Sequence, residues 1–131
     1  MELTAAAGTR WLLLDKSALV RGVDVDANLG EPCLCVITRL EVLYSARSSD
    51  HYEQLEAELD VFHGLRVSTE TFAIARTAQR ELAATGGHRL PIPDLVIAAC
   101  AQEHQAAVLH LDRHYATLAQ VLSFTPVRLD H

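Results

Sequence analysis

The chain has 131 residues, half of them hydrophobic, which is enough for one ordinary domain with a buried core. Its formal net charge of −6 excludes a broad basic surface, so any contact with nucleic acid has to be local. The amino-terminal residues lack the basic and apolar regions of a secretory signal, and no apolar run reaches the roughly 20 residues of a membrane span. We therefore expect a cytoplasmic protein without membrane contact, folded as a single domain over residues 1–131, in which residues 1–10 form a short mobile lead.

Five short apolar runs predict the strands of this domain. The first, from Trp11 to Leu14, is continuously apolar, as expected for a strand that is covered on both faces. In chain order, the expected strands occupy residues 11–14, 33–37, 65–67, 106–111 and 124–129. The segments between them favour helices at residues 16–21, 38–46, from 50 to a stop at Gly64, 68–85, from 93 onward and 113–120, with a polar loop or weak helix at 22–32.

Particular residues predict where the helices begin. Thr38 would cap a helix that carries Glu41 in its first turn. Asp50, with Glu53 three residues later, resembles a capping box for the next helix. Ser68 would cap the long helix that follows.

Strands and helices alternate along the whole chain. This order favours a mostly parallel central sheet of four to five strands with helices on both faces. The sequence therefore predicts a three-layer α/β/α domain. In such sheets, ligands bind in the crevice at the carboxyl ends of the strands.

Four carboxylates are expected at that end of the sheet. Asp15 and Asp112 come immediately after two predicted strands. Glu41 and Asp94 lie in the first turns of two predicted helices, and the helix that Asp94 opens is apolar all round. All four side chains can therefore converge on one crevice.

Two interpretations of these acids compete. Asp15, Asp94 and Asp112 could each cap a helix, because a carboxylate satisfies free N–H groups at a helix amino terminus. Glu41 and Asp94 fit that interpretation less well, because their surroundings are apolar and burying a charge is costly. Several like charges in one crevice repel each other, and a divalent cation is the simplest compensation. Oxygen ligands of this kind select Mg²⁺ or Mn²⁺ over Zn²⁺.

The three cysteines do not have the spacing of a metal site. Cys33 and Cys35 have no second pair that would complete a zinc site. In a strand they would point to the same face, so these two and Cys100 are expected to be buried packing residues.

Four segments together resemble the ordered signature of PIN-domain ribonucleases, and in particular the VapC toxins of VapBC toxin–antitoxin pairs. The resemblance extends from Trp11 to about Leu129. The segments are Asp15-Lys-Ser-Ala-Leu, Thr38-Arg-Leu-Glu-Val-Leu, Pro93-Asp-Leu-Val-Ile-Ala-Ala and Leu109-His-Leu-Asp-Arg-His-Tyr.

The resemblance implies a metal-dependent endoribonuclease that cleaves tRNA, rRNA or mRNA as the toxin of a type II toxin–antitoxin pair. The catalytic acids, holding one or two Mg²⁺ or Mn²⁺ ions, would be Asp15, Glu41, Asp94 and Asp112. The metal would lower the pKa of a water and neutralise charge on the phosphate during in-line attack. Ser17 matches the family's small hydroxyl position, where it would orient a carboxylate or the attacking water.

The sequence departs from the family at His114, which stands where many relatives have a further acid. This substitution favours one well-formed metal position over two, although His114 could itself touch a metal, a phosphate or the acids. Lys16, Arg89 and Arg113 are the other candidates for accessory or RNA-contacting roles.

The resemblance also implies partners. A VapB-like antitoxin would insert a basic segment into the acidic crevice, in keeping with the net charge of −6. A homodimer, a heterotetramer or a larger complex with the antitoxin is expected. The alternatives are a catalytically weak PIN-fold module that binds RNA or protein, and a receiver-type phospho-signalling domain. The receiver is disfavoured because Lys16, the only lysine, directly follows the first acid.

Overall fold

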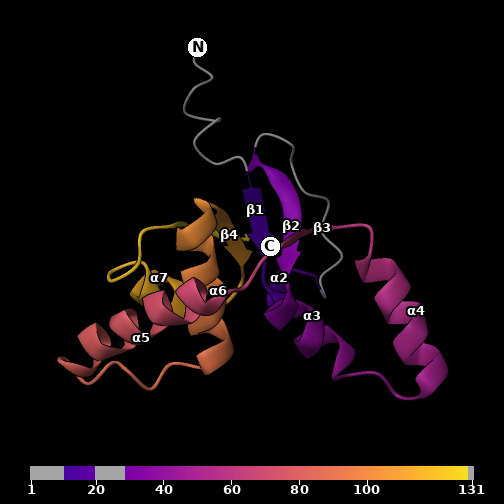
Figure 1. Ribbon diagram of the computed structural model, residues 1–131, viewed down its shortest axis with the longest axis horizontal. Coiled ribbons are helices and arrows are strands. Elements are labelled where there is room, and N and C mark those ends of the chain that lie inside the picture. Colours follow the sequence, from indigo (N-terminus) through magenta and orange to yellow (C-terminus); the bar gives the residue numbers. More distant parts are fainter. Residues whose placement is uncertain (1–10, 20–28, 130–131) are drawn as a thin grey trace, which may run out of the picture.

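A single parallel sheet organises the molecule (Figure 1). The computed structural model describes residues 11–19 and 29–129, so the predicted lead at 1–10 and most of the polar stretch at 22–32 lie outside the described residues. The sheet order is β3-β2-β1-β4-β5, and each neighbouring pair is parallel. The strands are β1 (Trp11–Leu14), β2 (Glu31–Cys35), β3 (His63–Leu65), β4 (Ala107–His110) and β5 (Thr125–Arg128).

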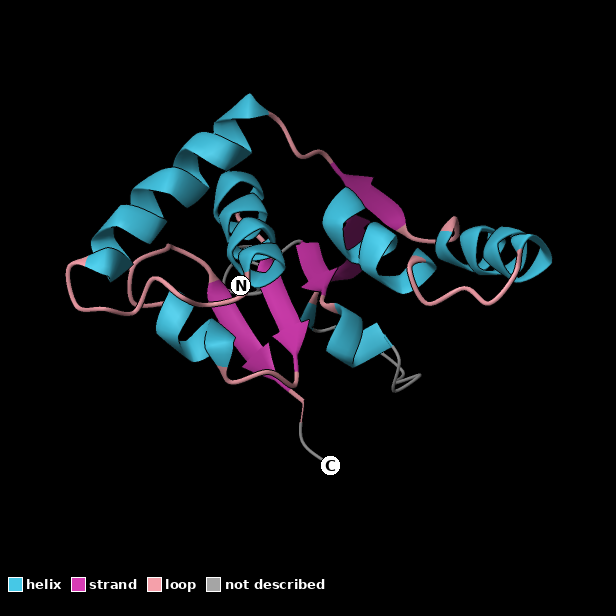
Figure 2. Ribbon diagram, turned by 90° about the horizontal axis from the view of Figure 1, so that it is seen from below, coloured by secondary structure: helices cyan, strands magenta, loops and turns pink. Residues whose placement is uncertain are grey.

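Helices cover both faces of this sheet (Figure 2). One apolar core joins the sheet to α5, α6 and α7, and a second joins its other face to α2, α3 and α4. These helices are α2 (Lys16–Leu19), α3 (Val36–Leu43), α4 (Ser49–Leu59), α5 (Thr69–Ala83), α6 (Ile92–His104) and α7 (His114–Leu118). The prediction of a three-layer α/β/α domain with a parallel sheet is confirmed.

The side chains of strand β1 show why the sheet needs helices on both of its faces. Leu13 packs into the core under α5, α6 and α7, whereas Leu12 and Leu14 pack into the core under α2, α3 and α4. Side chains alternate between the two faces of a strand, so a continuous apolar run is stable only where both faces are covered. Helix α6 is equally enclosed, and its residues from Asp94 to Ala101 are all buried.

The cysteines are packing residues, as the sequence predicted. Cys33, Cys35 and Cys100 are free, fully buried and members of the same core.

The junction between β2 and α3 differs from the prediction. The strand begins at Glu31 and ends at Cys35, so the expected range of 33–37 was two residues too late. Val36 and Ile37 are β-branched and suit a strand, but they form the first turn of α3 instead. Thr38 does not cap the helix; its hydroxyl donates to the Leu14 carbonyl at 3.1 Å and ties α3 to β1. Glu41 consequently lies in the second turn of α3, one turn later than expected.

Two boundaries around α4 were also wrong. The helix is capped by Ser48, whose hydroxyl accepts from the His51 amide at 3.0 Å, and Asp50 lies inside the first turn. Gly64 does not end the helix, because it belongs to β3 and pairs with Leu34 of β2. The second error arises because a local stop signal cannot reveal that Gly64 is paired in the sheet.

The long helix α5 begins as predicted. The Ser68 amide donates to the Thr71 hydroxyl at 2.9 Å in a capping box, and both residues also hydrogen-bond to Glu103 of α6. Helix α5 packs against α6, and α4 and α5 stand at opposite ends of the molecule (Figures 1 and 2).

The strand order places a topological switch between β1 and β4, because the chain winds outward from them in opposite directions. Ligands of open parallel sheets bind at the carboxyl ends of the strands beside such a switch. Among the described helices, none is long and apolar enough to cross a membrane.

Candidate metal centre

Asp15 follows β1 at the switch, and its carboxylate is held by three donors. Oδ2 accepts from the Ser17 amide at 3.1 Å and from the Ser17 hydroxyl at 2.7 Å. Oδ1 accepts from the Tyr115 hydroxyl at 2.8 Å. The Ser17 hydroxyl in turn accepts from the Leu111 amide at 3.0 Å. Asp15 therefore links β1, α2, α7 and the end of β4, and it is only 4% exposed.

Tyr115 was not assigned a role from sequence. It is fully buried in α7, and burial together with the charge of Asp15 raises the pKa of its hydroxyl, which stays a neutral donor. The signal was available: a tyrosine in an apolar helix has to place its hydroxyl beside an acceptor. Asp112 lies three residues before Tyr115, so the expected acceptor is one of the acids of the site.

Asp94, Asp112 and His114 form a second cluster beside Asp15. Asp94 lies in the first turn of α6 and is 6% exposed. The Nδ1 atom of His114 is 2.9 Å from Asp94 Oδ2 and 2.7 Å from Asp112 Oδ1. Asp112 also accepts from the His114 amide at 3.0 Å, which fixes its carboxylate at the start of α7. Both of the contacts of Nδ1 are to carboxylate oxygens, so Nδ1 donates here, and a cation that binds to Nδ1 has to displace its proton.

The acids of the crevice repel one another. The pKa of Asp94 is raised to about 6, chiefly by burial and also by the charges of Asp15 and Asp112, against the opposing effect of His114. Burial also raises the pKa of Glu41, with a further contribution from Asp15 that Lys16 opposes. Glu41, on α3, is therefore exposed to the charge of Asp15 as Asp94 is. The sheet end thus concentrates negative charge that these side chains compensate only in part.

The donor set fits a divalent cation. One ligand atom from each of Asp94, Asp112 and His114 lies within 4.8 Å of the other two. This is the size of one coordination sphere, because ligands on opposite sides of a Mg²⁺ ion are about 4 Å apart. Two carboxylate oxygens and one imidazole nitrogen suit Mn²⁺ as well as Mg²⁺.

His110 is a further buried polar residue beside the centre. It ends β4, is 3% exposed and packs its ring 4.8 Å from that of Tyr115, on the side of the sheet opposite to Leu109. Neither ring nitrogen has a hydrogen-bond partner among the described residues. Burial lowers its pKa, so the ring is neutral and supports Tyr115 by packing.

The basic candidates lie on three different segments. Lys16 is half-buried next to Asp15, Arg113 is exposed between Asp112 and His114, and Arg89 is exposed on the loop before α6. None of these three forms an ion pair with any of the described residues. Arg39 behaves differently, because its guanidinium is engaged with Asp60 and with Glu56 at 3.7 Å.

Comparisons with known proteins agree with this geometry. The model of the PIN domain family matches residues 12–121. Ribonuclease VapC17 of Mycobacterium tuberculosis is 42% identical over 120 residues, covering 86% of this chain and 90% of the relative. Ribonuclease VapC51 of the same organism is 36% identical, covering 82% and 79%.

Solved structures have the same fold. A member of the VapBC family of toxin–antitoxin systems from Mycobacterium tuberculosis, VapBC-5, matches with a TM-score of 0.70 at 25% identity, covering 91% of this chain and 98% of that one. DNA-bound VapBC from Salmonella typhimurium matches with a TM-score of 0.72 at 18% identity, covering 92% and 98%. The chain therefore belongs to the PIN-domain family, and within it to the VapC group.

Proposed function

We propose that this chain is a divalent-metal-dependent endoribonuclease that acts as the toxin of a toxin–antitoxin pair. The observation that carries the proposal is the cluster of Asp94, Asp112 and His114 at the carboxyl ends of the strands. The similar proteins that are named ribonucleases support RNA as the substrate. The cytoplasm, where such RNA is found, is the proposed compartment.

The residues of the centre would contribute to cation binding in different ways. Asp94, Asp112 and His114 supply ligand atoms directly, and Asp15 and Glu41 supply the remaining negative charge. Ser17 and Tyr115 keep the Asp15 carboxylate in one orientation. A bound cation would supply an activated water and neutralise charge on the phosphate. Lys16 and Arg113, whose charges are not paired within the described part of the chain, would draw the RNA backbone to the crevice.

One cation position of mixed oxygen and nitrogen ligands is more consistent with this centre than two. His114 replaces an acid of many relatives, and its Nδ1 lies between the carboxylates of Asp94 and Asp112. An imidazole ligand is better suited to Mn²⁺ than to Mg²⁺. We therefore propose a single site that accepts Mg²⁺ or Mn²⁺.

An exposed apolar stripe on α3 supports the antitoxin as partner. Val36, Leu40 and Tyr44 follow one another at helical spacing and are 46%, 55% and 90% exposed. Val61, two residues beyond the end of α4, is 79% exposed. Contiguous exposed apolar side chains mark surfaces that bind another protein. The similar structures titled VapBC pair a toxin with an antitoxin, and we propose that a VapB-like antitoxin covers this stripe.

The test is cleavage of structured RNA by the purified chain with Mg²⁺ or Mn²⁺, beside EDTA and an Asp94→Asn variant. We expect cleavage that needs the ion and is lost in the variant, while the exposed Glu58→Gln substitution on α4 leaves it unchanged. Cleavage that persists in EDTA or in Asp94→Asn would refute the proposal. If calorimetry detects no divalent-ion binding and no RNA is cleaved, the catalytically weak binding module is the better description.

A further inference from the structure

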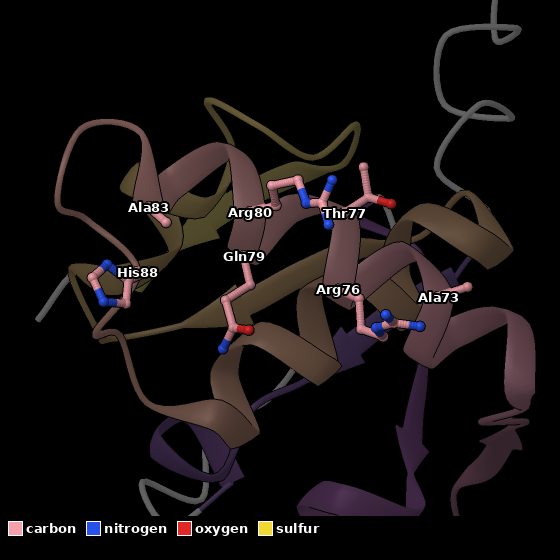
Figure 3. A pocket seen from close by; sticks show the side chains of 7 residues that line it. All are labelled: Ala73, Arg76, Thr77, Gln79, Arg80, Ala83 and His88. Carbon is pink, nitrogen blue, oxygen red and sulfur yellow. The ribbon is translucent and has the colours of Figure 1, made fainter.

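The outer face of α5 bears a pocket that the metal centre does not use (Figure 3). The pocket has a volume of about 600 Å³ and is open to solvent. Arg76 and Arg80 lie one helical turn apart along it, and His88 faces it from the loop beyond the carboxyl end of α5 (Figure 3). The rest of its lining is small or uncharged: Ala73, Thr77, Gln79 and Ala83.

The charged side chains that line this pocket, Arg76 and Arg80, are both positive. No carboxylate is among its lining residues. Within the described segments, neither Arg76 nor Arg80 forms an ion pair, in contrast to Arg39, which is engaged by Asp60 and Glu56. Each free guanidinium presents five N–H donors in a geometry that matches phosphate oxygens. In a chain with a net charge of −6, the pocket is a local basic site on an otherwise acidic molecule.

An exposed aromatic ring extends the same face. Phe72 lies one turn before Arg76 and two turns before Arg80, and it is 48% exposed. Aromatic rings that alternate with cationic side chains bind single-stranded nucleic acid, because bases stack on the ring while the cations contact the backbone. Phe72 and the two arginines therefore combine stacking with phosphate recognition along one helix face.

The chain leads from this face directly to the metal centre. Helix α5 ends at Ala83, the loop turns at Gly86 with φ +77, and α6 begins at Ile92, two residues before Asp94. Arg89 is exposed on the same loop and has no ion-pair partner in the described part of the chain. At no more than about 3.5 Å per residue, the segment from His88 to Asp94 spans at most about 20 Å. One RNA strand of several nucleotides can cover that distance.

We propose that Phe72, Arg76, Arg80 and His88 form a second RNA contact, here called the α5 site, which holds single-stranded RNA on one side of the scissile bond. The inference rests on the proposed function, because it assigns part of the substrate to a surface outside the metal centre. It explains how an acidic protein retains an anionic substrate: the backbone is bound at a distance from the acids that repel it. The site reads no base sequence, since its donors face phosphates and its ring stacks on any base.

The experiment first measures RNA binding by the Asp94→Asn variant, which leaves the RNA uncut. It then measures binding by a variant that carries Arg76→Ala and Arg80→Ala in addition to Asp94→Asn. Fluorescence anisotropy is measured with single-stranded RNAs of about 20 and about 5 nucleotides, lengths above and near a minimal strand site. The matched control carries Arg47→Ala and Arg66→Ala, two exposed arginines outside the pocket, and so has the same net charge. Circular dichroism and melting curves verify that each variant is folded.

We expect the Arg76/Arg80 variant to bind the long RNA about 10-fold more weakly, with the slope of log K against log salt reduced by about 1.4 for two lost phosphate contacts. Phe72→Ala should weaken the same RNA without changing that slope, because stacking releases no counterions. Binding of the short RNA should change little in either variant. Equal losses in the Arg47/Arg66 control, or an unchanged salt slope, would overturn the inference.

Failure of the inference and failure of the proposed function give different results. If the wild-type chain cleaves RNA in a metal-dependent way and the Arg76/Arg80 variant has an unchanged KM for long RNA, only the α5 site is wrong. If the chain binds long RNA through the α5 site but never cleaves it, the ribonuclease proposal is wrong and the site stands. If the double variant binds RNA as the control does and loses only the binding of a synthetic acidic peptide, the site contacts protein and the inference is overturned.

Discussion

Asp15 and Asp94 are two buried carboxylates of one crevice, and the protein treats them in opposite ways. They are 4% and 6% exposed. Asp15 accepts three hydrogen bonds from two residues of the fold, Ser17 and Tyr115. Asp94 has one side-chain contact, to His114, and its pKa is raised to about 6 by burial and by neighbouring acids.

This difference in hydrogen bonding indicates that the two carboxylates have different functions in one site. The donors around Asp15 satisfy its carboxylate oxygens, so this carboxylate is part of the architecture that joins β1 to α7. The charge on Asp94 is left for something else to neutralise, because burial makes the isolated carboxylate costly. A cation recruited to the site is therefore expected to be bound chiefly by the side of the crevice that contains Asp94, Asp112 and His114.

The comparison predicts different consequences for Asp94→Asn and Asp15→Asn. Asp94→Asn should reduce Mn²⁺ affinity by more than the roughly 100-fold effect typical of residues that only support a ligand. Asp15→Asn should reduce stability as well, by about 2–3 kcal/mol, because its amide group would face the donors of Ser17 and Tyr115. Calorimetric titration measures the affinity, and urea unfolding in EDTA measures the stability.

Glu58→Gln on the exposed surface of α4 serves as the control for both measurements. If Asp94→Asn destabilises the metal-free protein as much as Asp15→Asn does, the two carboxylates are not distinct and the comparison fails.

Tyr115→Phe tests the support of Asp15 alone. The substitution keeps the buried ring and removes the donor to Asp15 Oδ1, so we expect a loss of about 1–3 kcal/mol in unfolding free energy. Metal affinity should fall by about 10-fold, within the range seen for residues behind the ligands. The Tyr52→Phe substitution on α4, a tyrosine that is 38% exposed, should change neither quantity. An unchanged stability for Tyr115→Phe would show that the Ser17 donors alone hold the carboxylate.

The raised pKa of Asp94 predicts a pH dependence with a definite sign. Its pKa rises from 3.8 to about 6 on folding, so between these values the folded chain binds more protons than the unfolded chain. The contribution of this group to stability is therefore present below about pH 4 and is lost as the pH rises through 6. In EDTA, Asp94→Asn should gain stability relative to the wild type over that range, as followed by urea unfolding at several pH values. Stabilisation by added Mn²⁺ should increase over the same range, because the ligand has to be deprotonated.

The parts of this site that could be predicted from sequence are those set by local order along the chain. Asp15 and Asp112 directly follow apolar strand runs, so their placement at the carboxyl end of a parallel sheet follows from topology. Asp94 opens a helix that is apolar on every side, which placed it against the core. Ser17, two residues after Asp15, was expected to orient a carboxylate, and its hydroxyl lies 2.7 Å from Asp15 Oδ2.

The parts that could not be predicted depend on contacts between distant segments. The Tyr115 hydroxyl reaches Asp15 across 100 positions of sequence, and although the nearby Asp112 points to the site acids in general, no local pattern singles out Asp15 as the acceptor. The start of α3 was misplaced because pairing of β2 with β3, which ends at Cys35 and Leu65, sets the end of the strand rather than β-propensity. The pocket lined by Arg76 and Arg80 could not be predicted either. Helical spacing shows that the two side chains share one face of α5, but it does not show that the loop with His88 lies against that face.

The smallest expected effect concerns the choice of cation, and it depends on His114 alone. An imidazole nitrogen favours Mn²⁺ over Mg²⁺, whereas a third carboxylate favours hard ions without that distinction. His114→Asp should therefore lower the ratio of Mn²⁺ to Mg²⁺ affinity by up to about 10-fold, measured by calorimetry on the same preparation, while tightening the binding of Mg²⁺. His51→Asp at the exposed start of α4 is the control for the added charge. If the affinity ratio is the same in His114→Asp and in the wild type, Nδ1 of His114 is not a ligand. Its Nδ1 would then serve only to bridge the two carboxylates.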